Sequence, residues 1–126
     1  MKRGWIGLGL LALLLTVGLL VTGFMGRIHK EVSRELEEAA RAAGAGDWAE
    51  AAEDARDAFD AWQKHWHFSA AFADHEPMEE IDGQFAQLWP YLQSREAVAF
   101  SALCRELARQ VDAIGDAHGL NWWNLL

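Results

Sequence analysis

Residues 4–26 constrain this chain more than any other part of it, because they form an uncharged run of 23 residues rich in leucine, valine and glycine. A helix needs roughly 20 apolar residues to cross the hydrocarbon core of a bilayer. The run therefore predicts a transmembrane helix. It divides the 126-residue chain into a basic N-terminus with its anchor, residues 1–26, and one further domain, residues 27–126.

The domain after the anchor is strongly acidic. Two of the 11 Lys and Arg residues, Lys2 and Arg3, precede the apolar run, and all 19 Asp and Glu residues follow it. Residues 27–126 therefore hold 9 basic and 19 acidic side chains, a net charge of −10. Nucleic acid binding needs a basic face that neutralises phosphates and releases counterions, so this balance argues against a nucleic acid partner.

The apolar run also resembles the core of a secretory signal peptide. It is longer than the usual core of about 7–15 residues, and no Ala-x-Ala site follows it. These features favour an uncleaved anchor, and the alternative is a protein secreted after cleavage at Gly23. A very short basic N-terminus before a long acidic domain predicts a cytoplasmic N-terminus and an extracytoplasmic domain in a single-pass protein.

The domain is expected to be all-α, because the chain has only two prolines and its apolar residues recur every three or four positions. The predicted architecture is a transmembrane helix continuous with a small antiparallel bundle of about four helices. The expected elements are helices near residues 27–43, 47–73, 77–93 and 95–118, with a stop at Gly119 and an apolar tail at residues 120–126.

Short-range signals mark the ends of these helices. Gly44 suits the left-handed position past a helix end, and Asp47 with Glu50 forms a capping-box pattern at the start of the next helix. Pro90 predicts a kink in its helix or an end near Trp89. Ser94 is a candidate cap for the last helix.

Ligand-type side chains are densest between residues 65 and 79. Imidazole and carboxylate groups suit zinc or a related divalent metal, and the candidates are His65, His67, His75 and Glu79. On a helix, residues two apart do not share a face, and Pro77 separates His75 from Glu79. The other interpretation is that these histidines form hydrogen bonds at a turn between helices.

Aromatic side chains suggest a second candidate site. Trp62, Trp66, Phe68 and Phe72 fall close together and are candidates for lining a ligand groove. The alternative is that they fill the core, because a bundle this small needs the area that aromatic side chains bury.

Two further sets of residues point to the membrane. Tryptophans favour the bilayer interface, and small residues spaced by four can let two membrane helices approach closely, although glycine is also common in membrane helices generally. The interface candidates are Trp5, Trp122 and Trp123, and the candidate face for dimerisation of the span is Gly18, Thr22 and Gly26.

The run HEPMEEID at residues 75–82 is similar to a His-acid-acid-apolar-acid-x-Ile-Asp pattern. With Trp62, Leu88 and the ending Asn-Leu-Leu, it makes nearly the whole chain resemble the bacterial family named domain of unknown function 4363. Pro77 and the tryptophan pair at residues 122–123 depart from that pattern. The resemblance implies a short protein with an N-terminal membrane segment and a helical remainder, and it implies no activity.

The sequence carries no catalytic signature. It has no HExxH motif and no paired CxxC motif, and the single Cys104 lies on an inward apolar stripe, where a thiol is usually inert. We therefore predict a non-enzymatic interaction or accessory module at the bacterial cell membrane, without a cofactor. Its partners would be the bilayer and either another protein or a second copy. The alternative is a small-ligand or divalent-metal module built on the segment from His65 to His75.

Overall fold

The computed structural model describes the backbone of residues 2–69 and 76–124. It describes the side chains of residues 2–64, apart from Thr22 and Met25, and of residues 78–115. The described chain contains helices and no strands, which confirms the all-α prediction. The four helices are α1 (Lys2–Gly44), α2 (Trp48–Ser69), α3 (Glu76–Ser94) and α4 (Ala97–Asn124).

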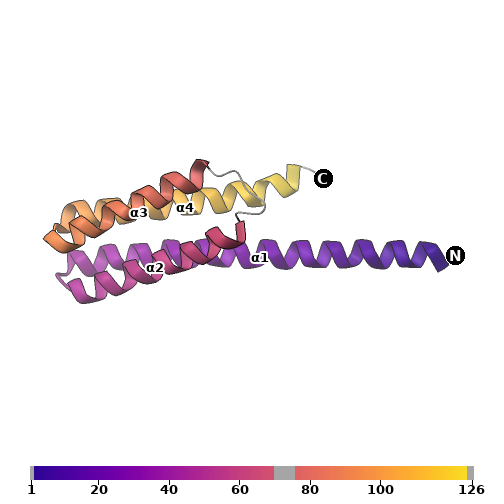
Figure 1. The fold of residues 1–126 in the computed structure, drawn as a ribbon, viewed down its shortest axis with the longest axis horizontal. Coiled ribbons are helices and arrows are strands. Elements are labelled where there is room, and N and C mark those ends of the chain that lie inside the picture. The colour runs from indigo at the N-terminus through magenta and orange to yellow at the C-terminus, as the bar shows by residue number, and fades with distance from the viewer. Residues whose placement is uncertain (1, 70–75, 125–126) are drawn as a thin grey trace.

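The helices pack in two layers at one end of the elongated molecule (Figure 1). α1 and α2 make one layer and α3 and α4 make the other, while the N-terminal half of α1 projects alone beyond the bundle. α1 packs most extensively against α4 and α2, and α3 packs mainly against α4. The predicted continuity between the apolar run and the first helix of the bundle is confirmed, because α1 has no break.

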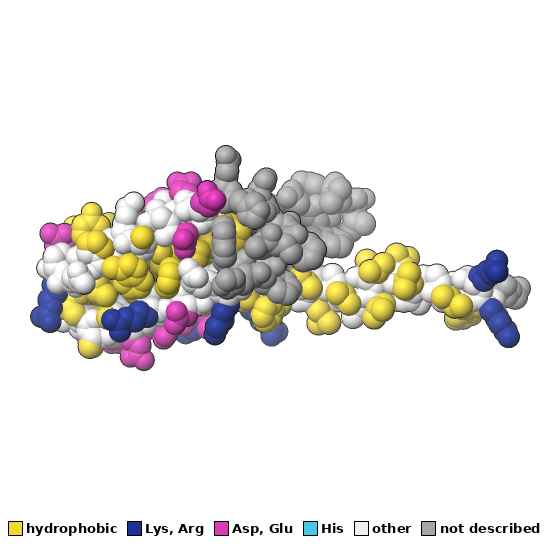
Figure 2. All heavy atoms as spheres, in the orientation of Figure 1, with side chains coloured by type: hydrophobic (Ala, Val, Ile, Leu, Met, Phe, Trp, Pro, Cys, Tyr) yellow, Lys and Arg dark blue, Asp and Glu magenta, His cyan; other side chains and the backbone are white. Residues whose placement is uncertain are grey.

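The projecting half of α1 exposes its large apolar side chains (Figure 2). In the described part of the chain, α1 is the helix that is long and apolar enough to cross a membrane, judged by length and composition. These exposed side chains are Trp5, Ile6, Leu8, Leu10, Leu11, Leu13, Leu14, Leu15, Val17, Leu19, Leu20 and Phe24. Exposure of this kind is costly in water and favourable in lipid.

Glycine and aspartate chemistry explains the turn between α1 and α2. Gly46, rather than Gly44, takes the left-handed conformation, with φ of 80°. The N–H groups of Gly46 and Asp47 donate to the carbonyls of Ala43 and Ala42, at 3.1 and 2.9 Å, which is the hydrogen-bond pattern of a Schellman motif. Asp47 then caps α2, since its Oδ1 accepts the N–H of Glu50 at 3.2 Å.

The turn between α3 and α4 differs from the expectation. α3 continues through Pro90 to Ser94 instead of ending near Trp89. The Ser94 hydroxyl donates to the Pro90 carbonyl at 2.9 Å, so it belongs to the end of α3 and does not cap α4. Arg95 takes the left-handed position, with φ of 53°, and Glu96 precedes the first residue of α4.

The end of α4 lies away from its expected position, and the expected end of the second helix falls outside the described residues. α4 continues past Gly119, where an end was expected, to Asn124, so the start of the expected apolar tail is helical. α2 is described to Ser69, and residues 70–73 of the expected helix lie outside the described part.

Residue size sets the spacing of the helices. Buried alanines line α1 and α2, and small side chains of this kind let helix backbones approach closely. α2 and α3 instead meet over few residues, because aromatic rings fill the space between them. The alanines of α1 and α2 that are fully buried are Ala39, Ala40, Ala51, Ala55 and Ala58. The aromatic residues in contact between α2 and α3 are Phe59, Trp62, Phe85 and Trp89.

Candidate interaction groove beside the apolar helix

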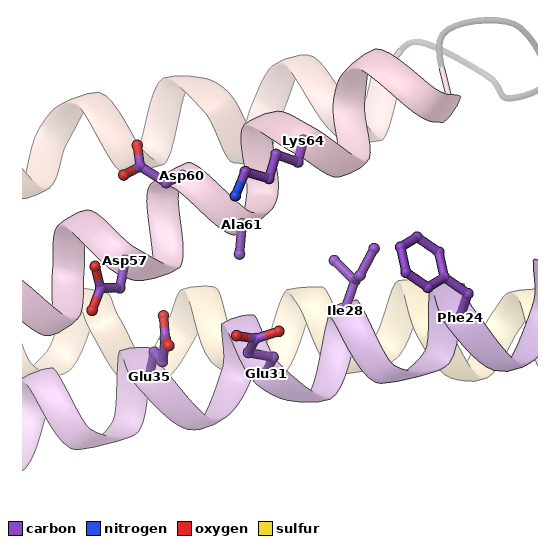
Figure 3. A pocket seen from close by; sticks show the side chains of 8 residues that line it. All are labelled: Phe24, Ile28, Glu31, Glu35, Asp57, Asp60, Ala61 and Lys64. Atoms are coloured by element: carbon purple, nitrogen blue, oxygen red, sulfur yellow. The ribbon is translucent and has the colours of Figure 1, made fainter.

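A groove of about 650 Å³ lies between α1 and α2, where the apolar half of α1 enters the bundle (Figure 3). It is large enough to hold several side chains of a bound segment. Its lining residues are Phe24, Ile28, Glu31, Glu35, Asp57, Asp60, Ala61 and Lys64. The groove therefore combines residues from the end of the apolar run with residues from the acidic part of the domain.

The polarity of the groove changes along α1. Phe24 and Ile28 supply an apolar surface at the end nearest the projecting helix, and Glu31 and Glu35 follow at helical spacing. Figure 3 shows both glutamates pointing from α1 toward α2, where Asp57 lies opposite Glu35.

Acidic groups outnumber basic ones among the lining residues. Four carboxylates line the groove, and Lys64 is the one cation among them. The groove is thus an acidic channel with an apolar end.

Glu35 experiences this excess of negative charge directly. Its pKa is raised from 4.5 to about 7, first by partial burial and then by repulsion from Asp57 and Glu31. Arg34 opposes the shift and Asp54 adds to it. Its Oε2 atom is buried without a hydrogen-bond partner. The positive charges nearby therefore do not offset this repulsion.

Replacing Glu35 with glutamine should make the domain less sensitive to pH. A carboxyl group whose pKa is higher in the folded state stabilises the fold below its unfolded pKa, and that contribution is lost as pH rises from about 4.5 through about 7. The variant avoids the loss, so at pH 8 its free energy of unfolding should exceed that of the wild type by about 1 kcal/mol, since solvent screening limits the effect.

Urea unfolding of the full-length chain in detergent micelles at pH 5 and pH 8 measures this difference. Glu37→Gln, at an exposed position of α1, is the matched control and should change little at either pH. An equal effect of Glu35→Gln at both pH values would contradict the assignment.

The structure places the predicted aromatic residues as follows. Trp62 is 1% exposed and lies in the core, stacked against Phe85 with ring centroids 6.5 Å apart. Trp66 and Phe68 belong to α2, but their side chains lie outside the described residues, as does all of Phe72. The structure therefore brings Trp62 into the core of the bundle and not to the open groove.

The structure describes the side chain of only one of the four metal candidates. Glu79 is exposed near the start of α3, whereas the side chains of His65 and His67 and the whole of His75 lie outside the described residues. Within the described residues, no three His, Cys, Asp or Glu side chains gather in a way that could hold a metal ion.

The membrane candidates lie on two helices. Trp5 is 76% exposed near the tip of α1, and Gly18 and Gly26 are partly buried on α1, whose Thr22 side chain is not described. Residues 122 and 123 belong to the last turn of α4, and the structure does not describe their side chains.

Cys104 is fully buried in α4. Burial raises the pKa of its thiol to about 12, so the group stays protonated at neutral pH. Because the thiolate is the reactive form, this cysteine is chemically inert in the folded chain.

The sequence did not predict the groove, although the spacing of four of its lining residues could have indicated part of it. Phe24 with Ile28 and Glu31 with Glu35 are spaced by four, which places each pair on one face of α1. The acids of α2 that face them depend on how the two helices are aligned, and the turn at residues 45–47 sets that alignment.

Comparison with known proteins gives one family. A family model described as a domain of unknown function (DUF4363) matches residues 21–125, which covers the end of the apolar run and almost all of the domain. Neither the curated proteins nor the solved structures include a significant match.

Proposed function

The chain belongs to the DUF4363 family, and we propose that it is a membrane-anchored interaction module whose groove between α1 and α2 receives a basic segment of a protein partner. The observation that carries this proposal is the joining of four carboxylates from two helices with an apolar surface in one groove.

The anchor of the module is the projecting half of α1. Its length and exposed apolar side chains suit a bilayer, and Lys2 and Arg3 at its tip favour a cytoplasmic N-terminus. The domain would then lie outside the cytoplasm, at the bacterial cell envelope. Because α1 continues into the bundle without a break, the anchor also determines how far the groove stands from the bilayer.

Charge complementarity supports the choice of a basic segment as the occupant of the groove. Four carboxylates against one lysine favour a partner with several Lys or Arg side chains, and paired charges would relieve the repulsion at Glu35. Phe24 and Ile28 would contact an apolar side chain of the same segment. Since Phe24 lies at the end of the apolar run, the segment that fits best follows directly on a partner's own membrane helix.

The lining residues favour binding over catalysis. Their polar groups are carboxylates and one amine, and they include no hydroxyl or thiol nucleophile beside a base. The long, open groove is also typical of a docking surface for a peptide segment.

Zero-length carbodiimide crosslinking of the full-length chain in native membranes tests the proposal, because this reagent joins carboxylates to lysine amines in direct contact. A product should form in which the segment containing Asp57 and Asp60 is joined to a partner lysine. Asp57→Lys combined with Asp60→Lys should lower its yield about tenfold. The absence of such a product, or a yield that this variant leaves unchanged, would contradict the proposal.

A control variant separates the groove from net charge. Glu80→Lys combined with Asp82→Lys makes the same charge change at exposed positions of α3 and should leave the crosslinked product unchanged. An equal loss of product in this control would show that total charge, and not the groove, governs binding.

A further inference from the structure

The C-terminal helix runs antiparallel to α1, and two hydrogen bonds define how the helices are aligned. The Ser101 hydroxyl donates to the Ala40 carbonyl at 3.1 Å, and the Ser33 hydroxyl donates to Asp112 Oδ2 at 2.9 Å. Moving along α4 toward its C-terminus therefore corresponds to moving along α1 toward its N-terminus, in the direction of the apolar run.

The two helices stay close at the end of the domain nearest that run. A Cβ placed on Gly115 would lie 3.3 Å from the Cβ of His29, so the backbone of α4 passes directly over α1 there. The Ser33–Asp112 and His29–Gly115 contacts are four residues apart along α1 and three residues apart along α4. The helices therefore run alongside each other almost residue for residue.

α4 continues past the level of residue 26, where the apolar run of α1 meets the domain. It extends nine residues beyond Gly115, to Asn124, which the same alignment places level with about residue 20 of α1. That level is six residues inside the apolar run, or about 9 Å at 1.5 Å per residue. Figure 1 shows that α4 reaches beyond the end of α2 to a level on the projecting half of α1, with a gap between the two ribbons in this view.

The composition of this end of α4 suits lipid. Its last five residues, 120–124, read LNWWN, and two leucines follow in the sequence; none of these seven residues has a charged side chain, and tryptophan favours the membrane interface.

Small residues recur on the part of α1 that faces α4. By their spacing along α1, positions 18, 22 and 26 fall on the same side of the helix as His29 and Ser33, which contact α4. Small residues in this arrangement let a second helix approach closely in a membrane. Gly18 and Gly26, considered above for dimerisation of the span, therefore lie on the side of α1 that turns toward α4, and space remains at Gly26, where a Cβ would meet no atom within 4 Å.

Backbone chemistry limits how deep the helix can go. The last four carbonyls of a helix have no partner within the helix, and each would cost several kcal/mol in hydrocarbon. These carbonyls therefore favour an end of α4 that stays close to the boundary between headgroups and acyl chains, where donors are still present.

We propose that the last two turns of α4 insert into the leaflet next to the domain, beside α1, so that the protein contacts lipid at a second place. The domain's net charge of −10 offers no attraction to anionic lipid, so this contact is apolar. The inference depends on α1 being the membrane anchor. Its consequence is a bundle held upright, with the groove between α1 and α2 kept at the lipid surface.

Single-cysteine labelling of the full-length chain in phosphatidylcholine–phosphatidylglycerol liposomes tests this. Variants Trp123→Cys, Leu20→Cys and Ser94→Cys would carry an environment-sensitive nitrobenzoxadiazole label. Cys104 can remain in place, because its buried, protonated thiol does not react. Lipids with a nitroxide on the acyl chain should quench the labels at residues 123 and 20 to a similar extent, by at least half, and leave the label at residue 94 unquenched.

The possible outcomes separate this inference from the anchor. Quenching at residue 20 without quenching at residue 123 would overturn the inference and leave the anchor intact, whereas no quenching at residue 20 would overturn the anchor itself. Since Trp123→Cys removes one interface residue, Leu125→Cys provides a second reporter that keeps both tryptophans. Quenching at residue 125 should be lost when Trp122 and Trp123 are changed to aspartate, and its persistence would count against an apolar contact.

Discussion

Replacing Leu14 and Leu15 together with arginine should release the full-length chain from membranes. Both leucines are exposed and lie near the middle of the apolar half of α1, too far from either end for an arginine to reach the headgroups. Each arginine at the centre of a span raises the apparent free energy of insertion by about 2.5–3.5 kcal/mol, so the pair should cost about 5–7 kcal/mol. The measurement is the fraction of the chain that stays in the membrane pellet after alkaline carbonate extraction.

Leu14→Ile combined with Leu15→Ile is the matched control, because it keeps the run apolar and should leave extraction unchanged. A double-arginine variant that resists carbonate as well as this control would contradict the anchor. The intact mass of the wild-type chain, measured in parallel, tests the alternative of cleavage at Gly23, which would remove most of the apolar run. A full-length mass in the pellet supports the uncleaved helix.

The helices could be predicted from the sequence because the buried apolar residues recur at helical spacing. Val32, Leu36, Ala39 and Ala43 recur every three or four residues, and all four are buried in the core. Periodicity of this kind reports which side of a helix meets its neighbours, so it predicts helices and their inner faces well.

The ends of the helices were harder to predict because turn chemistry leaves alternatives open. Two glycines flank Ala45, and the hydrogen bonds to Ala42 and Ala43 determine that Gly46 takes the left-handed position. At the next turn an arginine, Arg95, takes that position, although nothing in a local pattern marks a non-glycine residue for it. Both choices depend on how the following helix packs.

The candidate site was predicted only in part, because it joins two helices. The sequence shows acids on the outer faces of both helices, but Asp57 faces Glu35 only because of the particular alignment of α1 and α2. A cluster that is dense along the chain, such as the histidines between residues 65 and 75, is easier to notice. Closeness in sequence is nevertheless a weak guide to which side chains share one surface.

Replacing Trp62 with alanine should have the largest effect of any core substitution. The side chain is 1% exposed, stacks on Phe85 of α3 and meets the ring of His29 of α1 edge-on at 6.5 Å. It therefore connects three of the four helices, and no small residue can fill its space. Truncation of a buried aromatic side chain costs about 3–5 kcal/mol, a large part of the stability of a small domain.

Guanidinium unfolding of the full-length chain in mild detergent micelles, followed by near-ultraviolet circular dichroism, measures this loss. The tertiary signal is the appropriate one, because the apolar half of α1 should remain helical in the micelle after the bundle unfolds. Trp5→Ala removes the same side chain from an exposed position and should leave the unfolding midpoint unchanged, while Trp62→Phe should restore part of the loss. If Trp62→Ala cost no more than Trp5→Ala, the ring would contribute little to the core, and the interpretation of Trp62 as part of a ligand groove would become the better one.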